Sequence, residues 1–246
     1  MADDGRGAAG AASDSELTAI GVLTAAAVGG VDSAFLPAWH LLGARARRWM
    51  QRQGRHPLNG SPVLLLPGVH ESPRFLDPFA ALALANGRQP HLVTALHRNV
   101  RPITATALQT ADYLERHDLR DVLIIAHSKG GLVGKQVMTW ERTSRRIRGM
   151  VAVATPFSGS VFATHAPLRS LRDFSPADET LLELAVNHSA NRAIVSAFPA
   201  FDPQIPGGSV LPDARANIRL PSAGHFRVLA EPELWALLRR ALLATA

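Results

Sequence analysis

One segment of the sequence, residues 121–131, constrains the fold more than any other. An apolar run over residues 122–125 leads through two further residues to Ser128, and two glycines follow almost at once, Gly130 and Gly131. Such a run is typical of a buried strand, and the glycines allow a helix to begin close behind it. A serine at this sharp turn is held with its hydroxyl exposed, which suits a nucleophile. The segment therefore predicts a strand–turn–helix unit with Ser128 at its corner.

Short apolar segments alternate with helical patterns along the rest of the chain. We expect strands at residues 63–66, 92–95, 122–126, 150–154, 193–197 and 217–220. We expect helices at residues 75–85, 102–117, 130–141, 176–187 and 231–243. This alternation predicts an α/β fold with a mostly parallel central sheet flanked by helices on both faces. The 246 residues, 47% of them hydrophobic, suit one sizeable core.

The first sixty residues differ from this pattern and are expected to form an N-terminal extension, with the catalytic domain over 61–246. Residues 1–16 are rich in Gly, Ala and Asp, which favours a disordered start. Residues 35–53 then predict an amphipathic helix. Its apolar face would carry Phe35, Ala38, Leu42, Ala46 and Trp49, and a basic face Arg45, Arg48, Arg52 and Arg55. This helix either packs on the body, which we favour, or makes peripheral membrane contact through 35–55.

Composition excludes several kinds of chemistry. The chain has no cysteine, so disulfides, cysteine nucleophiles and thiolate metal sites are absent. Its net charge is +6, almost all of the positive charge being arginine, with lysine only at Lys129 and Lys135. A basic chain can bind nucleic acid, but a single tyrosine and the lack of a nucleic-acid motif argue against it. No metal-ligand spacing such as H-E-x-x-H occurs, and we expect neither cofactor nor metal.

The apolar stretch over residues 17–31 bears on location. The stretch is too short to indicate a membrane-spanning helix, and it ends at the charged Asp32. The charged residues before it are mainly acidic, whereas a secretory signal begins with positive charge. We therefore expect a cytoplasmic protein, with membrane association left open.

Three polar residues follow predicted strands at the edge where parallel sheets bind ligands. They are Ser128, Asp202 and His225, in that chain order. Asp213 is the main competitor for the acid, and His70 and His127 are the main competitors for the histidine. We assign the roles to Asp202 and His225.

Four motifs in this order resemble the α/β-hydrolase family, and within it bacterial serine esterases and lipases most closely. Residues 126–131, Ala-His-Ser-Lys-Gly-Gly, are similar to the nucleophile elbow. Residues 155–160, Thr-Pro-Phe-Ser-Gly-Ser, are similar to a lipase loop that has His where this chain has Phe157. Residues 202–206, Asp-Pro-Gln-Ile-Pro, resemble the segment bearing the family's acid. Gly224 and His225 resemble the pair bearing its base. The resemblance covers about residues 61–246.

The resemblance implies an α/β-hydrolase fold with a small lid-like segment at about 159–190. It also implies ester hydrolysis through an acyl-enzyme on Ser128, with His225 as base and Asp202 orienting it. The backbone N–H groups of Lys129 and Val69 would form the oxyanion hole. Pro67-Gly68 stands where the family often has His-Gly, which departs from its pattern beside Val69. We expect substrate contacts from His70, Phe157 and Phe162, and a solvated Lys129 side chain.

Other functions share this architecture. An acyltransferase, thioesterase or amidase would use the same three residues, and an inactive relative would serve as a binding protein. The substrate is expected to be a small-molecule or lipid-like ester, and the sequence does not indicate the oligomeric state.

Overall fold

A single parallel sheet forms the centre of the computed structural model, which describes residues 14–53, 60–164 and 166–244. Its strand order is β2-β1-β3-β4-β5-β6, and every neighbouring pair is parallel. The strands are β1 (Gly60–Leu66), β2 (Arg88–Leu92), β3 (Val122–His127), β4 (Ile147–Val153), β5 (Ile194–Phe201) and β6 (Ala216–Ala223). The predicted α/β class with a mostly parallel sheet is confirmed.

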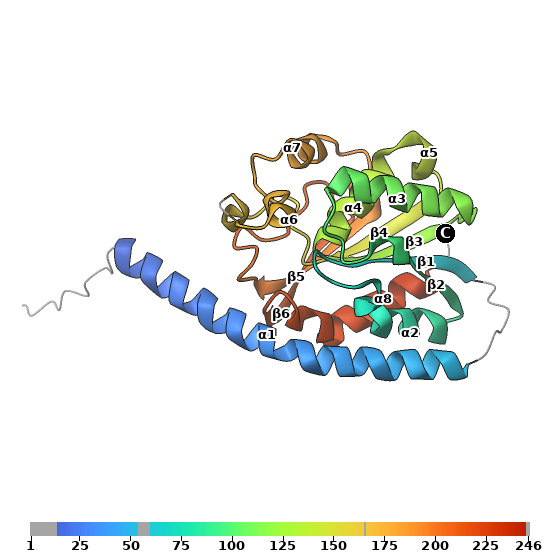
Figure 1. Cartoon of the computed structure of the whole chain (residues 1–246), viewed down its shortest axis with the longest axis horizontal. Helices are drawn as coiled ribbons and strands as arrows, with labels where there is room; N and C mark the ends of the chain where they lie inside the picture. The colour runs from blue at the N-terminus through green and yellow to red at the C-terminus, as the bar shows by residue number, and fades with distance from the viewer. Residues whose placement is uncertain (1–13, 54–59, 165, 245–246) are drawn as a thin grey trace, which may run out of the picture.

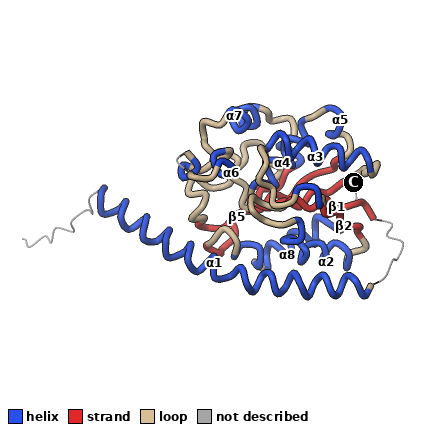
Figure 2. The backbone as a smooth tube through the Cα atoms, in the orientation of Figure 1, coloured by secondary structure: helices blue, strands red, loops and turns tan. Residues whose placement is uncertain are grey.

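Helices cover both faces of this sheet (Figures 1 and 2). One face carries α3 (Ile103–Arg116) and α4 (Lys129–Thr139), with the short α5 (Glu141–Ser144) beside them. The other carries α2 (Asp77–Ala85) and α8 (Pro232–Leu243). The short helices α6 (Arg169–Arg172) and α7 (Glu179–Val186) lie in the segment predicted to be lid-like.

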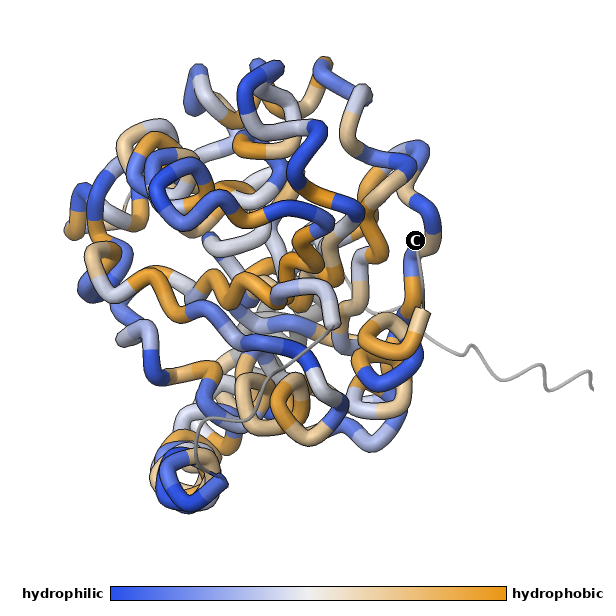
Figure 3. The backbone as a smooth tube through the Cα atoms, turned by 90° about the vertical axis from the view of Figure 1, so that its right-hand side faces the viewer, coloured by the Kyte–Doolittle hydropathy of each residue, from blue (hydrophilic) through white to orange (hydrophobic). Residues whose placement is uncertain are grey.

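The sheet separates two buried apolar clusters. Strand β1 shows why, because Leu64 and Leu66 point into the cluster under α3 and α4, while Val63 and Leu65 point into the cluster under α2 and α8. Figure 3 shows apolar segments gathered in the middle of the molecule and the N-terminal helix end-on at its lower edge. Burial of both strand faces explains the continuous apolar runs in the sequence.

The N-terminal extension is one helix, α1 (Asp14–Arg52), which packs beside α2. Residues 14–16, expected in the disordered start, are already helical; residues 1–13 and 54–59 lie outside the described residues. The predicted apolar face is wrong by about one position. Trp39 is the buried centre, since its ring packs on Phe79 and its Nε1–H donates to the Phe75 carbonyl at 2.9 Å. Leu42 and Trp49 are exposed instead.

Several element boundaries differ from prediction, and two of these differences have a clear local cause. The strand expected at 92–95 is instead β2 at Arg88–Leu92, and residues 94–96 form a 3-10 turn. Because β2 lies at the edge of the sheet, its residues are only partly buried and show no apolar run in the sequence. Helix α7 begins after Asp178, whose carboxylate accepts the Leu181 N–H, so Asp178 caps it in place of Ser175.

None of the helices within the described ranges combines the length and apolar character needed to cross a bilayer.

Candidate active site

Ser128 lies in the sharp turn between β3 and α4. Its backbone has φ 51° and ψ −122°, a conformation that non-glycine residues rarely adopt, and its N–H donates to the Val153 carbonyl at 2.8 Å. The glycines behind it make the turn possible. A Cβ on Gly130 would lie 2.1 Å from the Leu66 carbonyl oxygen, and one on Gly131 only 2.0 Å from a side-chain oxygen. The backbone of α4 thus approaches the sheet as only glycine permits, and the predicted strand–turn–helix unit is present.

Asp202 and His225 meet at the carboxyl ends of β5 and β6. The Asp202 Oδ2 lies 2.7 Å from the His225 Nδ1, and both side chains are almost fully buried. The other carboxylate oxygen accepts the backbone N–H groups of Gln204 and Ile205, at 2.8 and 3.1 Å. Asp213, the competing acid, instead faces His188 at the surface. The structure therefore brings together the acid and histidine that the sequence analysis paired.

Burial and charge act in opposite directions on this pair. Burial lowers the pKa of His225, but the Asp202 carboxylate, followed by those of Glu71 and Asp32, raises it, and the net pKa lies above 6.5. Burial raises the pKa of Asp202, but His225 and two backbone N–H donors lower it, and the net pKa lies below 3.8. The pair thus favours an ionised carboxylate beside an imidazole that readily holds a proton.

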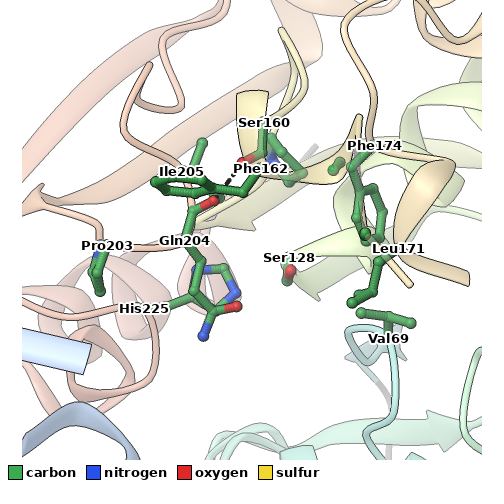
Figure 4. A pocket seen from close by; sticks show the side chains of 13 residues that line it. Val69, Ser128, Ser160, Phe162, Leu171, Phe174, Pro203, Gln204, Ile205 and His225 are labelled. Atoms are coloured by element: carbon green, nitrogen blue, oxygen red, sulfur yellow. Dashed lines mark hydrogen bonds between the residues drawn. The ribbon is translucent and has the colours of Figure 1, made fainter. Parts of the chain in front are cut away.

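Ser128 and His225 line one cavity of about 240 Å³ (Figure 4). The lining is mainly apolar and includes Val69, Phe162, Ala163, Leu171, Phe174, Pro203 and Ile205. No hydrogen bond joins the Ser128 hydroxyl to the His225 ring within the described ranges; such bonds often tighten only when substrate is bound. The same part of the chain holds no cluster of three His, Asp or Glu side chains arranged for a metal ion.

Two backbone N–H groups are available beside Ser128. Lys129 is the first residue of α4, so its N–H has no partner within the helix. Val69 lines the cavity, and its N–H has no acceptor among the residues described. The neighbouring Gly68 N–H, in contrast, donates to Glu71 Oε2 at 2.5 Å. The Asn99 side chain donates to the Pro67 carbonyl at 2.7 Å, so side chains hold this loop from both sides.

A buried chain of contacts, missed in the sequence analysis, links this loop to His225. The fully buried His127 has its Nδ1 2.7 Å from Glu71 Oε1 and its Nε2 3.1 Å from the His225 carbonyl oxygen. The His127 ring is thus held between a carboxylate oxygen and a backbone carbonyl oxygen. The sequence analysis named His127 only as a competitor for the histidine role. Glu71 is a lone acid 56 residues away from it, and the sequence holds no signal of the pairing.

Of the three predicted substrate contacts, only Phe162 lines the cavity. His70 donates to or accepts from the Ser170 hydroxyl at 3.2 Å, and Phe157 is buried in the core beneath α3 and α4. Neither side chain lines the cavity, so Phe162 is the predicted contact that the cavity supports.

The expectation of a solvated Lys129 side chain is wrong. It is fully buried, and its Nζ donates to the Arg101 carbonyl at 2.6 Å and to Asp173 at 3.2 Å. These acceptors, together with the Phe174 ring 5.7 Å from Nζ, compensate the ammonium for lost water. Lys135 is buried as well, and its Nζ donates to the Leu184 carbonyl; burial lowers its pKa to about 8. Both lysines thus fix α4 to the segment around α6 and α7.

Several solved structures are similar in fold to this chain. No family model and no curated protein matches the chain. A lipase from Bacillus licheniformis is 13% identical, with TM-score 0.59, over 77% of this chain and 94% of the lipase. An extracellular α/β-hydrolase from a Paenibacillus species is 18% identical, with TM-score 0.52, over 74% and 98%. A haloalkane dehalogenase from Agrobacterium tumefaciens is 14% identical, with TM-score 0.51, over 76% and 90%.

The chain therefore has the α/β-hydrolase fold. By their names, the lipase and the haloalkane dehalogenase act on different kinds of bond. Because one fold hosts many reactions, the reaction of this chain has to be argued from its own site.

Proposed function

We propose that this protein is a serine hydrolase that cleaves carboxylic esters. The observation that carries the proposal is that His225, paired with the buried Asp202, lines the same cavity as Ser128, which sits in a strained, positive-φ turn. In the proposed reaction His225 takes the hydroxyl proton while Ser128 Oγ attacks the ester carbonyl carbon. Asp202 stabilises the imidazolium, and His225 returns the proton to the leaving alcohol. In the second half of the reaction, water attacks the acyl carbonyl carbon while His225 takes its proton. His225 then returns this proton to Ser128 Oγ as the carboxylic acid leaves.

The tetrahedral intermediate needs donors for its oxyanion. We assign this role to the backbone N–H groups of Lys129 and Val69, which have no acceptor in the described structure. Each such donor typically contributes about 100- to 1,000-fold in rate. The Gly68 N–H is not assigned, because Glu71 already accepts it.

The cavity lining supports an ester with an apolar acyl group. Leu171, Phe174 and Ile205 are buried or half-buried around it, while Phe162 is 60% exposed and lies at its rim. Apolar walls with a few polar groups at one end are typical of sites that bind a hydrocarbon chain and fix its reactive end.

Hydrolysis of p-nitrophenyl esters from short to long acyl chain tests the proposal. The wild type, Ser128→Ala and the control Ser158→Ala, an exposed serine after β4, are assayed together. We expect Ser128→Ala to lose on the order of 10⁴-fold or more in kcat while staying folded, and Ser158→Ala to match the wild type. Turnover retained by folded Ser128→Ala would overturn the assignment.

The same three residues also serve acyl transfer, thioester cleavage and amide cleavage. Product analysis with water and competing alcohols separates hydrolysis from transfer. Equal turnover of thioester or amide analogues would move the assignment to those bonds, and no turnover of any acyl bond would favour a binding role.

The outward face of α1 supports a second proposal, peripheral contact with anionic membranes. It exposes Leu41, Leu42 and Trp49 beside Arg45, Arg48 and Arg52. Basic amphipathic faces bind anionic interfaces through both kinds of side chain. Gly54 and Arg55, at the end of the predicted 35–55 contact, lie outside the described residues. The expected cytoplasmic location stays a prediction.

Co-sedimentation with phosphatidylcholine vesicles, with and without phosphatidylserine, tests this contact. We expect binding that requires the anionic lipid, weakens with salt and is lost when the three arginines become glutamine. Binding insensitive to lipid charge and salt, or no binding, would contradict it.

A further inference from the structure

The N-terminal helix reaches the loop that carries His225. Asp32 of α1 is only 1% exposed, and its carboxylate accepts three consecutive backbone N–H groups. His225 N donates at 2.8 Å, Phe226 N at 2.9 Å and Arg227 N at 2.8 Å. These bonds connect positions up to 195 residues apart. Hydrogen bonds to an ionised acceptor are the stronger kind, so this contact fixes the loop firmly.

Gly224 provides the room for this contact. Its φ is +121°, and a Cβ there would lie 2.4 Å from Asp32 Oδ1. A side chain at this position would therefore push the His225 loop and Asp32 apart. The glycine before the histidine is explained by the approach of a carboxylate from α1.

Other contacts dock α1 independently of Asp32. Trp39 packs and hydrogen-bonds to the segment around Phe75, as described above. Near the end of the helix, Arg47 Nε donates to Asp77 Oδ2 at 2.7 Å. Arg47 lies fifteen residues beyond Asp32, about 22 Å along the helix axis. The docking of α1 and its contact with the His225 loop can thus be disturbed separately.

We propose that Asp32 is a positioning residue for His225, so that α1 forms part of the active-site architecture. The inference rests on the proposed role of His225 as base. The Asp32 carboxylate accepts the backbone N–H of His225, and the His127 ring contacts the backbone carbonyl oxygen of His225. With both backbone groups held, the start of the His225 side chain is fixed, and the Asp202 carboxylate at Nδ1 then orients the ring.

The charge of Asp32 also acts on the imidazole. The titratable groups that face His225 are Asp202 after β5, Glu71 after β1, His127 at the end of β3, and Asp32 on α1. The Asp32 carboxylate is among the groups that raise the pKa of His225 against the lowering effect of burial. Its removal therefore lowers that pKa.

The test compares Asp32→Asn and Asp32→Ala with Arg47→Ala, which breaks the ion pair to α2 only. We expect both Asp32 variants to lose about 10- to 100-fold in kcat/KM, mainly in kcat, because small displacements of a reacting group cost this much. We also expect the acid limb of the kcat/KM profile, and the His225 pKa seen by NMR titration of its ring, to move to lower pH. Arg47→Ala changes thermal stability and leaves both unchanged.

Wild-type kcat and an unmoved His225 titration in folded Asp32→Asn would overturn the inference. Asp32→Asn has the same shape and keeps an acceptor, so it decides the question if Asp32→Ala does not fold. Should the wild type cleave no ester, the proposed function fails, while the NMR titration still shows whether Asp32 acts on His225. Loss of activity in Arg47→Ala equal to that in Asp32→Asn would also overturn it, because α1 docking in general would then be the cause.

Discussion

The turn that carries Ser128 and the loop that carries His225 are held by different means. Backbone geometry fixes the first, since β3 runs between β1 and β4 and Gly130 packs directly on the β1 backbone. Side chains fix the second, and they come from α1, from the loop after β5 and from the end of β3. The turn of the proposed nucleophile is thus specified by eleven neighbouring residues, 121–131, and the loop of the proposed base by carboxylates and a ring from across the chain.

The largest expected effect comes from Gly130→Ala, which attacks the locally held turn. The new Cβ would meet the Leu66 carbonyl oxygen at 2.1 Å. We expect a loss of about 3 kcal/mol or more in unfolding free energy, by urea denaturation, and no ester turnover. Gly207→Ala, where a Cβ meets open space, is the control and should match the wild type. A stable, active Gly130→Ala would show that the turn is not packed as described.

The next effect comes from Asp202→Asn, at the loop held by side chains. We expect kcat to fall about 10³- to 10⁴-fold, because an amide no longer orients the imidazole in the required tautomer or stabilises its charge. Asp213→Asn breaks an exposed pair with His188 and should leave kcat unchanged. Equal losses in both variants, or none in Asp202→Asn, would remove Asp202 from the proposed triad.

Glu71 connects the two regions, so its variants measure how far they depend on each other. We expect Glu71→Ala to lower kcat/KM about 10- to 100-fold, since it frees both the Gly68 N–H and His127. Glu71→Gln can accept from Gly68 and donate to a neutral His127, so we expect a smaller loss. Ester kinetics of both variants check this order; a Glu71→Gln variant as impaired as Glu71→Ala would show that charge matters more than bonding.

The pH profile reports on the side-chain-held loop alone. As the proposed base, His225 would act only when neutral, and the surrounding carboxylates outweigh burial to raise its pKa above 6.5. We therefore expect kcat/KM to fall as pH drops, through a midpoint above pH 6.5, with the fold intact. A midpoint below 6.5 would mean that burial outweighs the carboxylates.

The smallest effect concerns the cavity wall, which belongs to neither region. Phe162 is 60% exposed at the rim and Phe174 is buried, and both line the cavity. We expect Phe162→Ala to shift the preferred acyl length without changing stability. We expect Phe174→Ala to shift it as well and to lower the free energy of unfolding by about 3 kcal/mol. An unchanged ester profile in both variants would exclude these side chains from the acyl site.

The same contrast explains what the sequence could predict. The turn at Ser128 was predictable, because an apolar run and glycines within one short segment specify it. The positions of Asp202 and His225 at one sheet edge were predictable from their places after strands. Asp32 and Glu71 were not, since each is a single acid whose partners lie far along the chain and no period or spacing marks them.

Burial on a helix was predictable only in part. The helical period of α1 was identified, but several alanines and leucines make more than one face apolar, and the position of Trp39 against Phe75 and Phe79 selects one. Lys129 was expected in solvent because lysine usually is. Its burial depends on the Arg101 carbonyl and Asp173, acceptors that only the folded chain brings there.

The central claim is that these two differently held regions together make Ser128 a nucleophile. Reaction with a fluorophosphonate reagent, followed by peptide mass mapping, tests this without assuming a substrate. The account predicts one adduct, on Ser128, absent in Ser128→Ala and formed far more slowly in His225→Gln. Adducts on another residue of the folded protein, or none at all, would contradict it.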